Sequence, residues 1–298
     1  MRRFKQTIGL LLTMLVVTVA IVACNDQTNQ AKAIVVGSKN FTESIILGEL
    51  IAQQIEASTD LEVKRRLNLG GTFICHQAIT TGELDIYPEY TGTAFVAILK
   101  NEPSSNADAV ASQLQKQYQE DFQLTWLPSF GFANNQAIVI RGEDARQFAI
   151  ATISDVTAYT PEWQAGFDFE FIERKDGLDG LLSTYEMVFA GTPKTMDYSL
   201  TYRALADGQV DLISVGTTDA LIESLDLVVL KDDRNYFPTY TAAPVVRLDT
   251  LAEHPELEPA LSSLAGRLDA VEMRRLNYLV DVEEQDVKQV VSDFLATL

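Results

Sequence analysis

The sequence predicts an α/β protein of two lobes that are joined by two extended crossings. Short apolar runs typical of buried strands alternate with the apolar stripes of helices, beginning with the strand-like residues 33–38. Two extended segments, near residues 133–137 and 236–242, interrupt this alternation. Both segments are explained if the chain leaves the first α/β region at one of them and returns to it at the other. Such a chain has a crevice between its lobes that can close over a ligand.

The first α/β region opens with the strand at 33–38 and a helix whose apolar stripe runs from Ile46 to Ile55. Asn40 followed by Glu43 is typical of a helix N-cap and its capping partner. The elements expected next are a strand within 61–69, a helix over 72–81, a strand over 84–87 and a helix over 109–122.

The second α/β region begins after the extended residues 132–140. Its expected elements are a helix start at 152–155, a strand over 167–172, helices over 177–184 and 198–206, and a strand over 210–215. Residues 240–248 are again extended and apolar, and the remainder reads as helices. Leucines from Leu251 to Leu268 mark one helix, and apolar residues from Val287 to Leu295 mark another. We therefore assign residues 33–135 and 240–298 to lobe 1, and residues 136–239 to lobe 2.

The N-terminus reads as an export signal over residues 1–23. A basic start is followed by an apolar run too short for a comfortable membrane span. Small or branched residues directly before Cys24 resemble a bacterial lipobox, in which the cysteine is lipidated and becomes the first residue of the mature chain. Residues 24–32 then form a polar tether. The alternative is a plain signal peptide with a chance cysteine.

The chain is strongly acidic. Removing residues 1–23 takes away three positive charges from a total of 23, so the mature charge is 20 minus 42, or −22. This balance argues against nucleic acid as a partner, and against an anionic membrane surface, so the lipid is the expected anchor. It favours a solvated surface.

Cysteine and histidine usage predicts neither a disulfide nor a metal site. Only Cys75 remains once Cys24 is assigned to lipid, and His76 and His254 lie far apart without metal-ligand spacing. We expect no cofactor. The adjacent Cys75 and His76 are expected to be structural residues rather than a reactive thiolate pair.

The segment Asp85–Thr93 places tyrosines, acids and hydroxyls where a strand passes into a loop and helix. Ligands of α/β proteins bind at such edges, next to loops and helix N-termini. An ordinary strand-end turn with stacked tyrosines is the alternative reading of this stretch taken alone.

Five segments together resemble a known family over essentially the whole mature chain: Gly37–Glu43, Leu67–Thr72, Asp85–Thr93, Tyr202–Gly208 and Ala242–Val246. They are similar to the quaternary-amine substrate-binding proteins, the glycine betaine, choline and carnitine receptors of osmoprotectant ABC transporters. The resemblance implies a two-lobed periplasmic-binding-protein clamp of type II-like fold, with the ligand between the lobes. Bacterial members are often lipoproteins.

In that family a cage of tyrosines holds the trimethylammonium head, which has no N–H donor and is attracted by π faces. Tyr90 and Tyr240 match two cage positions. The chain departs from the pattern at two others, where it carries Gln136 and Gly216. Two lost faces forfeit about 1 to 4 kcal/mol of cation binding. The sequence offers several aromatic residues as possible compensation: Phe130, Phe132, Tyr87, Tyr198 and Tyr236.

The resemblance also implies a clamp for the ligand carboxylate, made by Lys39, Thr93 and Arg174. A guanidinium, an ammonium and a hydroxyl form a sound anion site. The alternatives are a solvated turn lysine, a helix-cap threonine and a surface arginine. Because the clamp is kept and the cage is altered, we expect a zwitterion whose head differs from simple betaine. An amino-acid betaine with a ring, or glycine betaine bound weakly, fits this pattern.

We therefore expect a monomeric, lipid-anchored receptor outside the cytoplasmic membrane that delivers a small zwitterion to an ABC permease with its ATPase subunits. A sensory lipoprotein without a permease is one alternative. An enzyme on the same scaffold is another, although the sequence lacks a phosphate-binding glycine loop, metal spacing and a nucleophile elbow.

Overall fold

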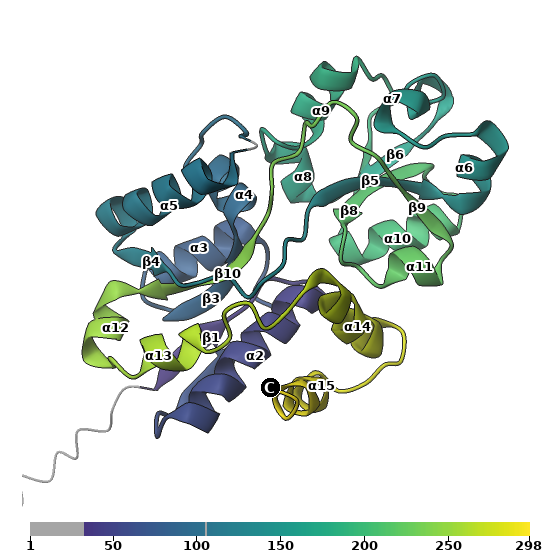
Figure 1. The fold of residues 1–298 in the computed structure, drawn as a ribbon. Helices are drawn as coiled ribbons and strands as arrows, with labels where there is room; N and C mark the ends of the chain where they lie inside the picture. The colour runs from purple at the N-terminus through teal and green to yellow at the C-terminus, as the bar shows by residue number, and fades with distance from the viewer. Residues whose placement is uncertain (1–32, 105) are drawn as a thin grey trace, which may run out of the picture. The chain divides into compact units, whose positions relative to one another are not determined.

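A computed structural model describes residues 33–104 and 106–298. The expected signal segment, Cys24 and the tether to residue 32 lie outside these described residues. Two five-stranded sheets with helices make up the described chain, which confirms the predicted α/β class (Figure 1). We call the first sheet with its helices lobe 1 and the second sheet with its helices lobe 2.

The sheet of lobe 1 has the strand order β2-β1-β3-β10-β4. Its strands are β1 (Ile34–Gly37), β2 (Val63–Arg66), β3 (Ile86–Tyr90), β4 (Leu124–Trp126) and β10 (Ala242–Arg247). β1 runs parallel to β2 and β3, whereas β10 is antiparallel to β3 and β4. The early helices are α2 (Thr42–Ser58), α3 (Thr72–Thr80), α4 (Thr91–Thr93), which continues as a π-helical turn over Ala94–Ile98, and α5 (Ala107–Phe122). The C-terminal helices are α12 (Leu248–Glu253), α13 (Leu257–Ser262), α14 (Ala270–Asp281) and α15 (Val287–Leu295).

The sheet of lobe 2 has the order β7-β6-β8-β5-β9. Its strands are β5 (Gln136–Arg141), β6 (Ala165–Phe167), β7 (Lys194–Thr195), β8 (Leu212–Gly216) and β9 (Leu227–Leu230). Here β6 is parallel to β7 and β8, while β5 is antiparallel to β8 and β9. The helices are α6 (Gly142–Phe148), α7 (Ile153–Val156), α8 (Phe169–Glu173), α9 (Leu178–Tyr185), α10 (Tyr198–Ala206) and α11 (Leu221–Ser224), with a 3₁₀ turn at Thr160–Glu162.

The chain passes between the sheets twice, after β4 and after β9. The two crossings pair with each other, because Ala133 forms an antiparallel bridge with Thr241. All strands of the second sheet fall within the segment 136–239 that the sequence analysis assigns to lobe 2. The exact lobe boundaries remain a prediction.

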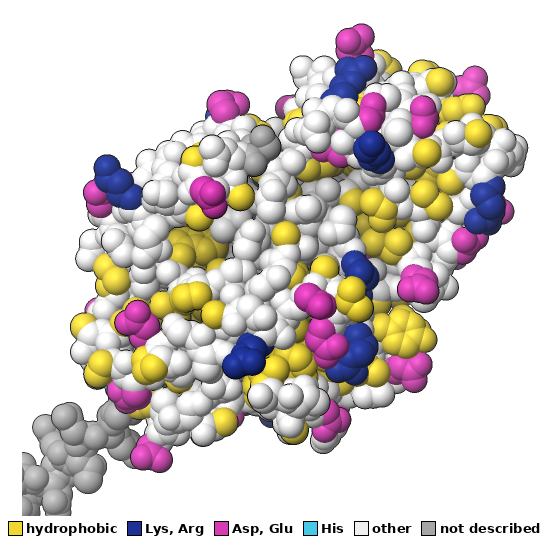
Figure 2. All heavy atoms as spheres, viewed as in Figure 1, with side chains coloured by type: hydrophobic (Ala, Val, Ile, Leu, Met, Phe, Trp, Pro, Cys, Tyr) yellow, Lys and Arg dark blue, Asp and Glu magenta, His cyan; other side chains and the backbone are white. Residues whose placement is uncertain are grey.

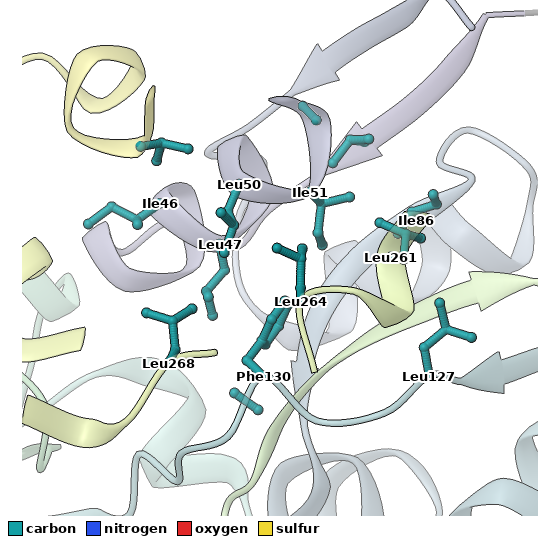
Figure 3. Close-up of a cluster of buried hydrophobic side chains, with 14 of the residues drawn as sticks. Ile46, Leu47, Leu50, Ile51, Ile86, Leu127, Phe130, Leu261, Leu264 and Leu268 are labelled. Carbon is teal, nitrogen blue, oxygen red and sulfur yellow. The ribbon is translucent and has the colours of Figure 1, made fainter. Parts of the chain in front are cut away.

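Helix α2 is the centre of the core of lobe 1. Its apolar stripe, which includes Leu47, Leu50 and Ile51, packs against β-strand residues and against leucines of the C-terminal segment (Figure 3). Leu261, Leu264 and Leu268 come from that segment, more than 200 residues later in the chain. The C-terminal helices therefore complete the lobe in which the chain began.

Three local expectations were wrong. Residues 167–172 do not form one strand: β6 ends at Phe167, and Asp168 then caps α8 by accepting the backbone N–H groups of Glu170 and Phe171. The leucines from Leu251 to Leu268 lie on two short helices and a loop, since the residue before Pro255 is disfavoured in a helix.

The third error concerns the start of α2. The N-cap is Phe41 rather than Asn40, and no side chain caps the helix. The side chain of Glu43 is not available for capping because it is buried in a hydrogen-bond network.

The surface agrees with a well-solvated protein. Figure 2 shows acidic and basic side chains scattered over one face, without a broad patch of a single sign. None of the helices in the described part of the chain is both long and apolar enough to cross a bilayer.

Leu50→Ala should destabilise the protein by about 2 to 5 kcal/mol, because Leu50 is fully buried and the truncation leaves a cavity. Urea unfolding followed by circular dichroism measures the change. Val271→Ala is the matched control: Val271 is 67% exposed, and its truncation should cost within about 0.5 kcal/mol. Equal losses in both variants would contradict the placement of α2 in the core.

Candidate functional site

A cavity of about 320 Å³ is lined by residues of both lobes. This volume lies at the lower end of small-molecule sites, which span about 300 to 1,000 Å³. Lobe 1 contributes Lys39, Asn40, Phe41, Gly71, Thr72, Phe73, Ile74, Tyr90 and Thr93, and the two crossings contribute Asn134 and Tyr240. Lobe 2 contributes Gln136, Asp168, Phe169, Glu170, Phe171, Arg174, Met196, Asp197, Tyr198 and Gly216.

All seven ligand-binding residues predicted from the sequence line this cavity: Lys39, Tyr90, Thr93, Gln136, Arg174, Gly216 and Tyr240. They stand at the ends of elements. Tyr90 ends β3, Gln136 begins β5, Gly216 ends β8, and Arg174 follows α8. Residues as far apart in the chain as Lys39 and Tyr240 are thus brought to one place, although their role in binding stays a prediction.

Three aromatic rings form a continuous wall, which we call the aromatic wall: Tyr90, Phe41 and Tyr198. The ring of Phe41 lies between the other two, with centroid distances of 6.1 Å to Tyr90 and 5.9 Å to Tyr198. Sequence reasoning named Tyr198 only as a possible compensation and missed Phe41, which lies within the Gly37–Glu43 segment. Of the other aromatics considered as compensation, none of Tyr87, Phe130, Phe132 and Tyr236 lines the cavity.

Lys39 is held by a buried ion pair. Its Nζ lies 2.5 Å from Oε1 of Glu89 and 5.1 Å from the centroid of the Tyr90 ring. Glu89 also accepts hydrogen bonds from the Tyr87 hydroxyl at 3.2 Å and from the backbone N–H of Tyr90 at 2.6 Å. One acid of the Asp85–Thr93 segment therefore orients the lysine, and two of the three ammonium N–H groups are left to donate.

Arg174 is held in the same manner from the other side of the cavity. It forms a two-pronged ion pair with Asp176, with Nε–Oδ1 at 2.8 Å and Nη2–Oδ2 at 2.5 Å, and its Nη1 donates to the Thr93 hydroxyl at 3.2 Å. The Tyr240 hydroxyl donates to Asp176 at 2.7 Å. Arg174 and Thr93 thus converge across the two lobes, as the clamp requires. Two guanidinium N–H groups and the Thr93 proton remain available to a ligand.

Gln136 and Gly216 stand at the two positions that depart from the family's tyrosine pattern, and their surroundings differ. Gln136 donates a hydrogen bond from its amide to the Ser214 hydroxyl. Gly216 leaves no empty space beside it, because a Cβ there would lie 2.3 Å from Oδ1 of Asn134. The side chain of Asn134 fills the space next to Gly216 into which a larger side chain would extend.

Lobe 2 presents three carboxylates to the cavity, from Asp168, Glu170 and Asp197. Burial raises the pKa of Asp168. Glu170 reaches across to lobe 1, where a Cβ on Gly71 would lie 1.9 Å from its Oε1. Lys39 and Arg174 are each paired with an acid, so these three carboxylates give the cavity a net negative formal charge.

Behind the aromatic wall, Tyr198 donates its hydroxyl to the carboxylate of Asp219. Tyr202 donates to the same carboxylate. Burial raises the pKa of Asp219 to about 7. Asp219 does not line the cavity, so it makes no direct contact with a ligand bound there.

Cys75 and His76 take the structural roles expected of them. Burial raises the pKa of the Cys75 thiol to about 12 and lowers that of His76 to about 4, so at neutral pH they do not form a thiolate–imidazolium pair. Among the described residues, no group of three or more His, Cys, Asp and Glu side chains is placed to hold a metal ion.

Two α/β lobes that share an aromatic and charged cavity define a small-ligand-binding protein. Residues 32–297 match the family described as the substrate binding domain of the ABC-type glycine betaine transport system. The chain belongs to this family, which confirms the resemblance seen in the sequence.

Individual relatives agree with the family. The ergothioneine transport permease/ergothioneine binding protein of Helicobacter pylori is 36% identical over 270 residues, covering 90% of this chain and 48% of the relative. The chain thus spans about half the length of that protein. The glycine-betaine-binding protein of Pseudomonas aeruginosa is 36% identical over 277 residues, covering 89% of this chain and 88% of the relative.

Among solved structures, a glycine betaine/carnitine/choline ABC transporter protein superposes with a TM-score of 0.72 at 30% identity. The match covers 89% of this chain and 98% of the other. The names of these relatives describe binding and transport, and they give no support to the enzyme alternative.

The titration of Asp219 should be visible in the stability of the protein. Asp219 has a pKa of about 7 in the folded state, against an ordinary value of 3.8, so the folded state binds the proton more tightly than the unfolded state does. The free energy of unfolding should therefore fall as the pH rises from about 4 to about 7. Above about pH 7 this group should cause no further change. Asp219→Asn keeps the acceptor for Tyr198 and Tyr202 and removes the titration. Urea midpoints of both proteins across this range should converge at low pH and separate toward neutral pH, with the variant more stable. Parallel curves would contradict the raised pKa.

Proposed function

We propose that this chain captures a zwitterionic quaternary amine outside the cytoplasmic membrane and delivers it to an ABC permease with its ATPase subunits. The observation that carries the proposal is the pairing, in one cavity, of the aromatic wall with the convergent donors Lys39, Thr93 and Arg174. Membership in the substrate-binding family supports it.

The head of such a ligand would lie against the aromatic wall. A trimethylammonium group has no hydrogen to donate, so π faces and dispersion are what a protein can offer it, at about 0.5 to 2 kcal/mol per contact. Phe41 and Tyr198 supply the faces that Gln136 and Gly216 do not. The chain therefore has a replacement for the altered part of the cage.

The carboxylate of the ligand would lie at the N–H groups of Arg174 that its ion pair leaves free and at the Thr93 hydroxyl. The Lys39 ammonium, which lies 5.1 Å from the centroid of the Tyr90 ring, would be a further donor next to the aromatic wall. The ion pairs with Glu89 and Asp176 fix both cations before the ligand arrives, which lowers the ordering cost of binding. Closure of the two lobes around the ligand would complete the site.

The ligand class that we favour is an amino-acid betaine with a ring that carries N–H groups, with ergothioneine as the first candidate. Glycine betaine has no N–H donor to offer the carboxylates of Asp168 and Glu170, whereas the imidazole thione ring of ergothioneine does. Oδ1 of Asp168 already accepts two backbone N–H groups, so the acceptors that such a ring would use are the second oxygen of Asp168 and the carboxylate of Glu170. The Helicobacter relative, whose name refers to ergothioneine, supports this choice.

Isothermal titration of the mature domain tests the ligand class directly. Ergothioneine should bind at least about tenfold more tightly than glycine betaine, carnitine or choline, which corresponds to about 1.4 kcal/mol. Histidine, which has a ring but no trimethylammonium group, is the control and should bind weakly or not at all. Submicromolar binding of glycine betaine would refute the argument from the altered cage.

Tyr90→Ala and Arg174→Ala should each weaken binding of the preferred ligand by at least about 1 kcal/mol, because one removes a π face and the other a carboxylate donor. Arg174→Lys keeps the charge that pairs with Asp176, and should still lose affinity because it lacks the planar fork. Arg146→Ala, on an exposed ion pair with Asp226, is the control. Unchanged affinity in both alanine variants would rule out the proposed site.

Lipid attachment at Cys24 is proposed as the membrane anchor. In a bacterial host that processes lipoproteins, Cys24→Ala should move the protein from the membrane fraction to the soluble extracytoplasmic fraction, because a buried acyl chain supplies about 0.8 kcal/mol per CH₂ group. Mass spectrometry of the mature N-terminus identifies the lipid. An unmodified cysteine in the wild type would support the plain signal peptide instead.

A further inference from the structure

Two tyrosines of the aromatic wall, one from each lobe, donate their hydroxyls to carboxylates behind the cavity. The Tyr90 hydroxyl lies 2.7 Å from Oε1 of Glu43, and the Tyr198 hydroxyl donates to Asp219. Neither Glu43 nor Asp219 lines the cavity. Burial, followed by the neighbouring carboxylate, raises the pKa of both phenols well above their ordinary value, so the hydroxyls stay donors.

Glu43 is surrounded by hydrogen-bond donors. It accepts hydrogen bonds from Tyr90, from the Asn134 amide at 3.0 Å, from the Asn277 amide at 3.2 Å and from the Thr218 hydroxyl. Four donors fill the acceptor capacity of a carboxylate, and the NH₂ groups of the two amides can only donate. Burial has the largest effect and raises the pKa of Glu43 overall, while these four hydrogen bonds act in the opposite direction.

Asp219 has no cation as a partner among the described residues. Its carboxylate faces Tyr198 and Tyr202 of α10, and the acids that act on it are Glu43 of α2 and Asp281 of α14. The backbone N–H of Gly216 donates to the Tyr198 oxygen at 2.9 Å, which fixes the ring from the cavity side. The hydroxyls of Tyr90 and Tyr198 are therefore bonded to acids that form no ion pair among the described residues. The Lys39 ammonium, in contrast, lies 5.1 Å from the centroid of the Tyr90 ring.

A carboxylate that accepts a phenol proton polarises the phenol and moves electron density toward the ring. The quadrupole that attracts a cation to the ring face is then strengthened. The negative charges themselves act on a cation at the wall through a low-dielectric medium, which screens them less than water does. Phe41, between the two tyrosines, lies in the same field.

We propose that Glu43 and Asp219 are positioning residues that orient Tyr90 and Tyr198 and make the aromatic wall selective for a permanent cation. The inference rests on the proposed function. It offers a physical reason why a wall without tyrosine at 136 and 216 still holds a quaternary amine. It also assigns a role to two buried acids, of which Glu43 was read from the sequence as a capping partner.

The test compares a cation with its uncharged twin. Glycine betaine and tert-butylacetate have the same shape and the same carboxylate, and differ in whether the head carries a charge. Titration calorimetry of the wild type, Glu43→Gln and Asp219→Asn gives the ratio of the two dissociation constants for each protein. Both substitutions keep the size of the side chain and an acceptor for the phenol.

We expect each variant to lose about fivefold or more in affinity for glycine betaine while the affinity for tert-butylacetate is unchanged. Glu43→Asp, which keeps the charge, should retain more of the preference than Glu43→Gln. Equal losses for both ligands would assign the acids a merely structural role and overturn the proposal. No change for either ligand would also overturn it.

A pH profile gives a second readout. Because the pKa of Asp219 is about 7, glycine betaine should bind the wild type more tightly at about pH 8 than at about pH 6. The groups that face Asp219 are Tyr198, Tyr202, Glu43 and Asp281, and the Asp219→Asn variant keeps all four. A pH dependence that persists in that variant would contradict the assignment.

Failure of this inference is distinct from failure of the proposed function. A wild type that binds neither ergothioneine nor glycine betaine at millimolar concentration refutes the function, and the inference falls with it. A wild type that binds one of them with the same cation preference as both variants refutes the inference alone.

Discussion

The buried carboxylate of Glu43 imposes the constraint on which the site depends. A carboxylate that is 1% exposed must be satisfied by donors, and here they come from four parts of the chain: β3, the two connections at Asn134 and Thr218, and α14. Asn277 also donates to the backbone carbonyl of Thr218 at 2.9 Å. Satisfying this one group therefore fixes Tyr90, the first crossing and the end of β8 relative to α2. The cavity is built in front of that network.

The two cations of the site are likewise held by buried acidic partners. Lys39 with Glu89 and Arg174 with Asp176 are buried pairs, each further bonded to a tyrosine hydroxyl or backbone group. Buried pairs add little to stability, since the desolvation of both charges offsets their attraction. Their value here is orientation: each cation keeps N–H groups free for a ligand while its position is set. A site of this kind binds without first having to order flexible side chains.

Much of the fold was accessible from the sequence because its signals are local. Helix Tyr198–Ala206 was predicted at its observed bounds, and the helix at Thr72 within one residue. The chain around residues 167–172 was misread because Asp168 ends the strand and caps a helix. The helix at Ala270–Asp281 lies in the stretch that was read as helices, but it was not singled out. In the site, the family motifs located the seven residues at the cavity. They did not reveal Phe41 as part of the wall, the Asn134 side chain beside Gly216, or the partners of Lys39 and Arg174, since these depend on contacts between segments that are distant in the sequence.

The orientation of the bound ligand tests the account most directly. A crystal structure of the mature domain with ergothioneine should place the trimethylammonium nitrogen within about 6 Å of the ring centroids of Tyr90, Phe41 and Tyr198. The carboxylate should lie within hydrogen-bond distance of Arg174 and Thr93. A ligand bound in the opposite orientation, with its cation beside Arg174, or bound outside this cavity, would contradict the account.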